Sequence, residues 1–94
     1  MSDAAERHMK ETGGLPRKAL SLRLRAFLRD TRGLSAENGA VVRNVADAVD
    51  NSVFEGDSVE ALVGEIETAA KELPAESAET LRAACAYARK RGSE

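Results

Sequence analysis

Hydrophobic residues recur every three or four positions in four successive segments of this 94-residue chain, with charged residues between them. This spacing is typical of amphipathic helices, each with one apolar face. We predict helices over residues 16–32, 36–54, 58–73 and 75–91. Because the connections are short, sequential helices are expected to be antiparallel neighbours in an all-α, four-helix bundle.

The residues between the segments support these boundaries. Proline at the first helical position costs no hydrogen bond, and glycine readily takes the left-handed conformation that ends a helix. The start and stop signals are Pro16 and Gly33, Ser35 and Gly56, Asp57 and Pro74, and finally Gly92. The clearest boundary is Gly56-Asp57, so residues 35–73 form a predicted helical hairpin on which the rest of the chain is expected to pack.

Helical spacing also predicts which side chains are buried. The expected core residues are Leu20, Leu24, Phe27 and Leu28 in the first helix; Val41, Val42, Val45, Ala48, Val49, Ser52 and Val53 in the second; Val59, Leu62, Val63, Ile66, Ala69, Ala70 and Leu73 in the third; and Pro74, Ala78, Leu81, Ala84, Cys85 and Ala88 in the fourth. Phe54 falls on the polar side of the second helix, so either that helix has ended before it or an aromatic ring is exposed.

One segment allows a second interpretation. Residues 20–25 alternate perfectly between apolar and polar, which is the period of a strand. A strand there, followed by helices, would suggest a ribbon-helix-helix regulator. That architecture needs a longer helix before the next turn than residues 26–32 provide, so we predict helix.

The chain is long enough for one small domain, which we place at residues 15–92 after a flexible tail at residues 1–14. Its only aromatic residues are Phe27, Phe54 and Tyr87. The core is therefore built mainly from Leu, Val, Ile and Ala and is thin. Self-association is a natural way for such a chain to bury more apolar surface.

Cysteine content and hydropathy indicate the compartment. The single cysteine, Cys85, cannot form an intramolecular disulfide. No apolar run approaches the roughly 20 residues of a membrane-spanning helix, and residues 1–14 lack the apolar core of a secretory signal. We therefore expect a cytoplasmic protein.

The net charge of −2 hides three blocks of opposite sign. Residues 15–33 contain six basic residues and one acid, for a net charge of +5, and residues 34–81 contain eleven acids and two basic residues, for −9. Residues 82–94 contain four basic residues and one acid, for +3. Such segregation indicates charge-specific contacts within the fold or with a partner.

Residues that could carry catalysis are scarce. Gly13-Gly14 lacks the Gly-Lys-Ser/Thr element of a phosphate-binding loop. His8 and Cys85 lie at opposite ends of the chain and cannot form a zinc site. The carboxylates follow the polar faces of the second and third helices, where solvation explains them. We expect no enzymatic activity, no cofactor or metal, and no small-molecule substrate.

Basic residues form two candidate binding surfaces. Lys18, Arg25, Arg29 and Arg32 share the outer side of the first helix, and Arg89, Lys90 and Arg91 end the fourth. These residues could contact an acidic protein or nucleic-acid phosphates, or they could pair with the acidic faces of the second and third helices. A helix-turn-helix interpretation of residues 36–73 is disfavoured because its recognition helix would be acidic.

Apolar residues on otherwise polar faces suggest an interface. Leu22, Phe54 and Tyr87 are of this kind, as is the small-residue outer face of the fourth helix. The sequence therefore predicts a protein–protein interaction module, with self-association as a homodimer. The alternatives are a nucleic-acid-associated regulator and an inhibitor or immunity-type protein that docks on an enzyme. The candidate contact residues are Lys18, Leu22, Arg25, Arg29, Arg32, Phe54, Tyr87, Arg89, Lys90 and Arg91.

Overall fold

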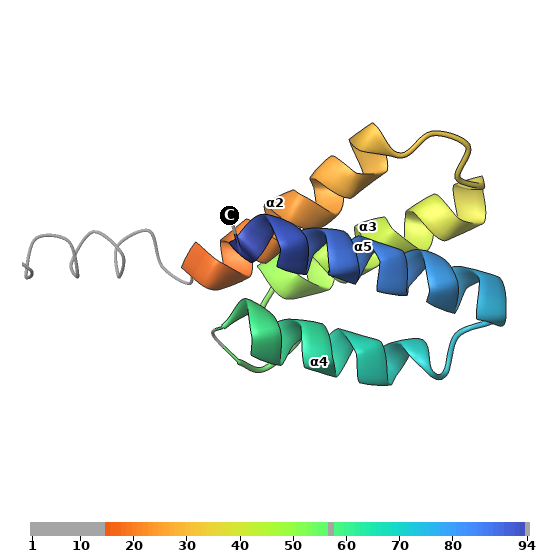
Figure 1. Ribbon diagram of the computed structural model, residues 1–94. Coiled ribbons are helices and arrows are strands. Elements are labelled where there is room, and N and C mark those ends of the chain that lie inside the picture. The colour runs from red at the N-terminus through yellow and green to blue at the C-terminus, as the bar shows by residue number, and fades with distance from the viewer. Residues whose placement is uncertain (1–14, 57, 94) are drawn as a thin grey trace, which may run out of the picture.

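The computed structural model describes residues 15–56 and 58–93, and this part of the chain contains four helices and no strand. The helices are α2 (Leu15–Asp30), α3 (Ala36–Asp50), α4 (Val59–Ala70) and α5 (Ala75–Ser93). Successive helices run in opposite directions (Figure 1). The all-α prediction is confirmed, and residues 20–25 are helical rather than a strand. The predicted tail at residues 1–14 lies outside the described residues.

α3 begins as predicted but ends four residues early. The Ser35 side chain accepts a hydrogen bond from the Asn38 N–H at 3.0 Å and caps its N-terminus. At the other end Ser52 takes a left-handed conformation with φ of 60°. The Val53 N–H then reaches back to the Ala48 carbonyl at 2.9 Å, which is the bond of a Schellman turn. The helix is closed by a serine in the place usually taken by glycine.

The predicted Gly56-Asp57 boundary is correct in position but wrong in its cap. The N-cap of α4 is Ser58, whose hydroxyl accepts the Ala61 N–H at 3.1 Å, whereas Asp57 lies outside the described residues. Gly56 has φ of +108°, and a Cβ there would lie 3.1 Å from the Cβ of Ala61. The turn therefore requires glycine at this position.

The ends of the last two helices also differ from expectation. α4 closes with three short-range bonds of the 3₁₀ type, from the N–H groups of residues 71, 72 and 73 to carbonyls three residues earlier. α5 was expected to stop at Gly92, but it continues to Ser93. No described helix is long and apolar enough to cross a membrane.

Two helices, α2 and α5, each pack against the other three. α3 and α4 run antiparallel but make few contacts with each other, so the predicted hairpin at residues 35–73 is not a packed unit. Most residues on the buried face of α5 are small, which lets neighbouring backbones approach closely. These buried residues are Ala78, Leu81, Ala84, Cys85 and Ala88.

Most predicted core residues are buried, and the errors cluster at the ends of helices. Leu20, Leu24 and Phe27 of α2 are buried as predicted. In α3 the buried stripe passes through Ala46, which the prediction omitted. Ser52, Val53, Ala69 and Pro74 were expected in the core but are exposed. The first two lie beyond the true end of α3, so the helical periodicity no longer applies to them.

The interface between α3 and α5 contains a buried polar pair. Asn38 and Ser77 are 5% and 4% exposed, and the Ser77 hydroxyl donates to the Asn38 side-chain oxygen at 2.8 Å. The Asn38 amide donates to a Glu76 carboxylate oxygen at 3.3 Å. Because this pairing has a defined direction, it favours one register of the two helices over slipped alternatives.

Candidate functional site

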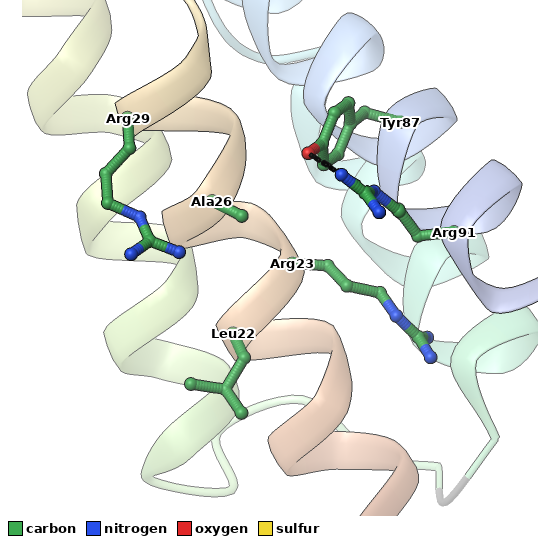
Figure 2. Close-up of a pocket in the computed structure, with 6 residues that line it drawn as sticks. All are labelled: Leu22, Arg23, Ala26, Arg29, Tyr87 and Arg91. Atoms are coloured by element: carbon green, nitrogen blue, oxygen red, sulfur yellow. Dashed lines mark hydrogen bonds between the residues drawn. The ribbon is translucent and has the colours of Figure 1, made fainter.

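The candidate site is an open groove between α2 and α5, which lie side by side (Figure 1). It has a volume of about 400 Å³. Figure 2 shows the lining side chains, four from α2 and two from α5: Leu22, Arg23, Ala26, Arg29, Tyr87 and Arg91. We call this feature the α2/α5 groove. Three of its six lining residues are arginines, so it is strongly basic.

The α2 side of the groove follows from helical spacing. Leu22, Ala26 and Arg29 are separated by four and three residues and therefore share one face of the helix. Arg23 extends from the adjacent row toward α5. Leu22 is 59% exposed and is one of two large hydrophobic side chains that are this exposed among the described residues. The solvent-exposed Leu22 side chain thus lies beside the guanidinium groups of Arg23 and Arg29.

The α5 side is held by contacts around Tyr87. Its ring packs edge-on against buried Phe27, with 5.9 Å between the centroids and 69° between the planes. Its hydroxyl donates to the Asp30 carboxylate at 2.6 Å. The Arg91 guanidinium donates to the same hydroxyl at 3.2 and 3.3 Å, and its Cζ lies 5.4 Å from the ring centroid. This wall is therefore ordered by the fold itself.

Two of the three groove arginines have charges that the described part of the chain does not neutralise. Arg23 and Arg29 form no hydrogen bond or ion pair there. Asp30 is the acid nearest to the groove along α2, and its carboxylate accepts the bond from Tyr87. The groove therefore presents guanidinium groups with open donor positions to solvent, suited to carboxylates.

Arg25, by contrast, is used within the fold. Its guanidinium donates to Asp47 at 2.7 Å and to Asp50 at 2.6 Å, which ties α2 to α3. The hydrogen bond to Asp47, followed by that to Asp50, raises the pKa of Arg25. Partial burial acts to raise the pKa of Asp50, but the hydroxyl of Ser21 and the charges of Arg25 and Lys18 outweigh it and hold that pKa below its ordinary value. The predicted basic stripe is therefore divided, since Arg25 has internal partners.

Arg89 and Arg17 also form internal contacts. Arg89 pairs with Glu60 at 2.9 Å and lies 3.8 Å from Glu67, linking α5 to α4. These pairs are solvent-exposed and contribute about 1 kcal/mol or less. Arg17 donates to the carbonyls of Phe54 at 2.5 Å and Gly56 at 2.9 Å, which fastens the α3–α4 loop to the first turns of α2. This role of Arg17 was not predicted from the sequence.

The remaining predicted contact residues lie outside the groove. Lys18, Arg32 and Lys90 are exposed, and none of them is a lining residue. Phe54 follows the end of α3 and packs, partly buried, against the core, so it is not a free aromatic surface. Of the ten predicted contact residues, the structure brings together Leu22, Arg29, Tyr87 and Arg91.

Arg23 and Ala26 were missed as site residues. The spacing of residues 22, 26 and 29 was available in the sequence and identifies one face of a helix. What the sequence did not show is that α5 lies along this face. That placement turns a basic helix surface into a groove with two walls.

Cys85 and the acidic side chains offer no second site of comparable definition. Burial, reinforced by the charge of Glu67, raises the pKa of the Cys85 thiol to about 12. At neutral pH this thiol is protonated and enclosed in the core. Within residues 15–56 and 58–93, no three His, Cys, Asp or Glu side chains gather closely enough to hold a metal ion.

No protein-family model, curated protein or solved structure matches this chain. The groove is therefore interpreted from its own geometry and charge.

Proposed function

We propose that this protein is a non-catalytic interaction module that binds an acidic segment of a partner protein in the α2/α5 groove. The observation that carries this proposal is the exposed Leu22 beside the unneutralised Arg23 and Arg29. An apolar contact provides affinity, and the flanking guanidinium groups select carboxylates. Tyrosine and arginine, which also line the groove, are the residue types that most often dominate binding energy at protein interfaces.

The shape of the groove favours a helical partner segment. From Leu22 to Arg29 the lining extends about 10 Å along the axis of α2, which matches two turns of another helix. An amphipathic helix placed between two helices is a recurrent mode of peptide recognition. We therefore propose an occupant with a central apolar side chain that contacts Leu22 and carboxylates that reach Arg23 and Arg29.

A protein partner is favoured over nucleic acid by the charge of the rest of the molecule. Residues 34–81, which include α3 and α4, carry a net charge of −9. Arg17, Arg25 and Arg89 bind acceptors within the fold. These three guanidinium groups are thereby less available to phosphates, and the acidic helices α3 and α4 oppose the approach of a phosphate backbone. Because a single cysteine cannot form an intramolecular disulfide, we propose a reducing compartment such as the cytoplasm as the location.

The test is a binding titration with a designed helical peptide in which glutamates lie one turn on either side of a central leucine. The control peptide carries glutamine in place of each glutamate. We expect the acidic peptide to bind in preference to the control, with an affinity that falls as salt is added. Arg29→Ala should weaken binding about tenfold, the equivalent of roughly 1.4 kcal/mol. Leu22→Ala should weaken binding of both peptides.

The matched control variant is Arg32→Ala, which removes the same charge from an exposed position outside the groove. It should bind the acidic peptide as the unmodified protein does. Equal losses for Arg29→Ala and Arg32→Ala would show non-specific attraction and contradict the proposal. Preferential binding of duplex DNA or RNA over the peptide would assign the groove to nucleic acid instead.

A further inference from the structure

Of the two large hydrophobic residues that are exposed in the described part of the chain, Leu22 lies beside arginines, whereas Val53 lies near an acid. Val53 is 69% exposed and follows α3 in the loop that joins it to α4. Glu55, two residues later, is exposed and forms no hydrogen bond or ion pair with the described residues. The loop thus carries an apolar side chain beside a free carboxylate, which is the combination that the α2/α5 groove is suited to accept.

The backbone of this loop holds Val53 outward. In many Schellman turns the residue after the left-handed position packs against the last turns of the helix. Here Ser52 occupies that position with φ of 60°, and the Val53 N–H is bonded to the Ala48 carbonyl at 2.9 Å, yet the valine side chain stays in solvent. A left-handed φ at a non-glycine residue stores backbone strain, and such strain is found most often at functional sites.

The Leu22 end of the groove is the end nearer to this loop along α2. Arg17 fastens the loop to α2 through the carbonyls of Phe54 and Gly56. Leu22 follows Arg17 by five residues, or about 7.5 Å along the helix axis. A two-fold axis at this end can therefore place the groove of each copy against the loop of the other. Such a reciprocal contact closes on itself, as the interfaces of symmetric dimers do.

We infer that a second copy of this chain is an occupant of the groove, with Val53 of each copy against Leu22 of the other and Glu55 near Arg23 and Arg29. This inference rests on the proposed function, since it uses the same groove and the same preference for an apolar side chain flanked by carboxylate. The resulting dimer hides the groove, and an acidic partner segment therefore competes with self-association.

The experiment is sedimentation equilibrium on the full chain, with two charge variants and a control. We expect the unmodified protein to form a dimer with a dissociation constant below about 1 mM. Leu22→Glu and Val53→Lys should each be monomeric at concentrations where the unmodified protein is dimeric. Ala83→Glu, at an exposed position of α5 outside both surfaces, should dimerise normally. Circular dichroism on each variant checks that the helices are retained.

Mixing the two charge variants provides a test that misfolding cannot imitate. In the mixed dimer one contact is the original Leu22–Val53 pair, and in the other the introduced carboxylate faces the introduced ammonium group. We expect the mixture to recover a dimer that neither variant forms alone. Continued dimerisation of both separate variants would overturn the inference, as would a mixture that stays monomeric.

Failure of this inference is distinguishable from failure of the proposed function. If the unmodified protein is monomeric and the acidic helical peptide still binds with dependence on Leu22 and Arg29, the groove recognises other proteins only. If the protein dimerises through these residues, adding the acidic peptide should dissociate the dimer. A dimer that the bound peptide does not affect would show that the groove lies outside the dimer interface and would overturn the inference.

Discussion

At the scale of single residues, two glycines of this chain are expected to respond oppositely to the same substitution. Gly64 lies inside α4, and a Cβ there meets nothing within 4 Å. Glycine in a helix interior destabilises by about 1 kcal/mol relative to alanine. Gly64→Ala should therefore raise the free energy of unfolding by about that amount, as measured by urea denaturation.

Gly56→Ala is the matched control for this prediction. The left-handed φ of +108° and the 3.1 Å approach to the Ala61 Cβ should make this variant less stable than the unmodified protein. If both variants changed stability in the same direction, the description of either α4 or the α3–α4 turn would be wrong.

Part of the candidate site was predicted from the sequence. The sequence identified Leu22, Arg29, Tyr87 and Arg91 because an apolar residue on a polar face and a basic cluster are visible without a structure. The sequence analysis also placed Arg25 among the basic residues available to a partner. The pairing of Arg25 with Asp47 and Asp50 depends on how α3 lies against α2, which helical spacing does not specify.

At the scale of the elements, the buried Asn38–Ser77 pair is expected to set the contact of α3 with α5. Ser77→Ala leaves the Asn38 side-chain oxygen without its donor in a buried position. The free energy of unfolding should fall by about 1–3 kcal/mol, the cost of an unsatisfied buried polar group. Urea denaturation of Ser77→Ala measures this loss.

Two further variants test whether the loss of stability comes from the unpaired Asn38 oxygen rather than from the removal of a hydroxyl group as such. Thr68→Ala removes an exposed hydroxyl that bonds a carbonyl of its own helix, and it should change stability little. Asn38→Leu combined with Ser77→Ala replaces both partners with apolar groups and should recover most of the loss. A single Ser77→Ala variant as stable as the unmodified protein would contradict this account of the interface.

Helix positions were predicted from the sequence more accurately than helix packing. Periodicity and end signals located all four helices, because each signal acts within a few residues. The alternative that the second helix ends before Phe54 is confirmed. Its exact end at Asp50 was missed since Ser52 is not a residue that usually takes a left-handed φ. The packing of α2 and of α5 against every other helix was missed because periodicity shows that a face is buried but not which helix covers it.

At the scale of the whole molecule, alkaline pH is expected to destabilise the fold through Cys85. The folded thiol has a pKa raised to about 12, from an ordinary value of 9.0. The unfolded thiol therefore loses its proton as pH passes about 9, while the folded thiol keeps it until about 12. Unfolding releases a proton in this window, so stability falls as pH rises, by at most about 1.4 kcal/mol per pH unit.

The control for this prediction is Cys85→Ala, which lacks the thiol but keeps the other alkaline groups. Its free energy of unfolding should decline less steeply between about pH 9 and 12 than that of the unmodified protein, because only the thiol contribution is removed. Denaturant titrations at several pH values give both slopes. Identical slopes would show that Cys85 is not held protonated by the core.

The arginines of the molecule fall into two groups, those bound within the fold and those exposed at the groove. Arg17, Arg25 and Arg89 join elements of the fold, whereas Arg23 and Arg29 remain available at the α2/α5 groove. This division is the basis of the proposed function, since the groove combines an exposed leucine with charges that nothing in the described part of the chain neutralises.

The most direct test of this proposal is to locate the bound acidic helical peptide on the full chain by residue-resolved NMR. Titration with the glutamate-containing peptide should shift the amide signals of residues 22–29 on α2 and 87–91 on α5, and the glutamine control should shift them far less. Shifts concentrated on α4, or spread evenly over all exposed basic residues including Arg32 and Arg43, would contradict recognition at the groove.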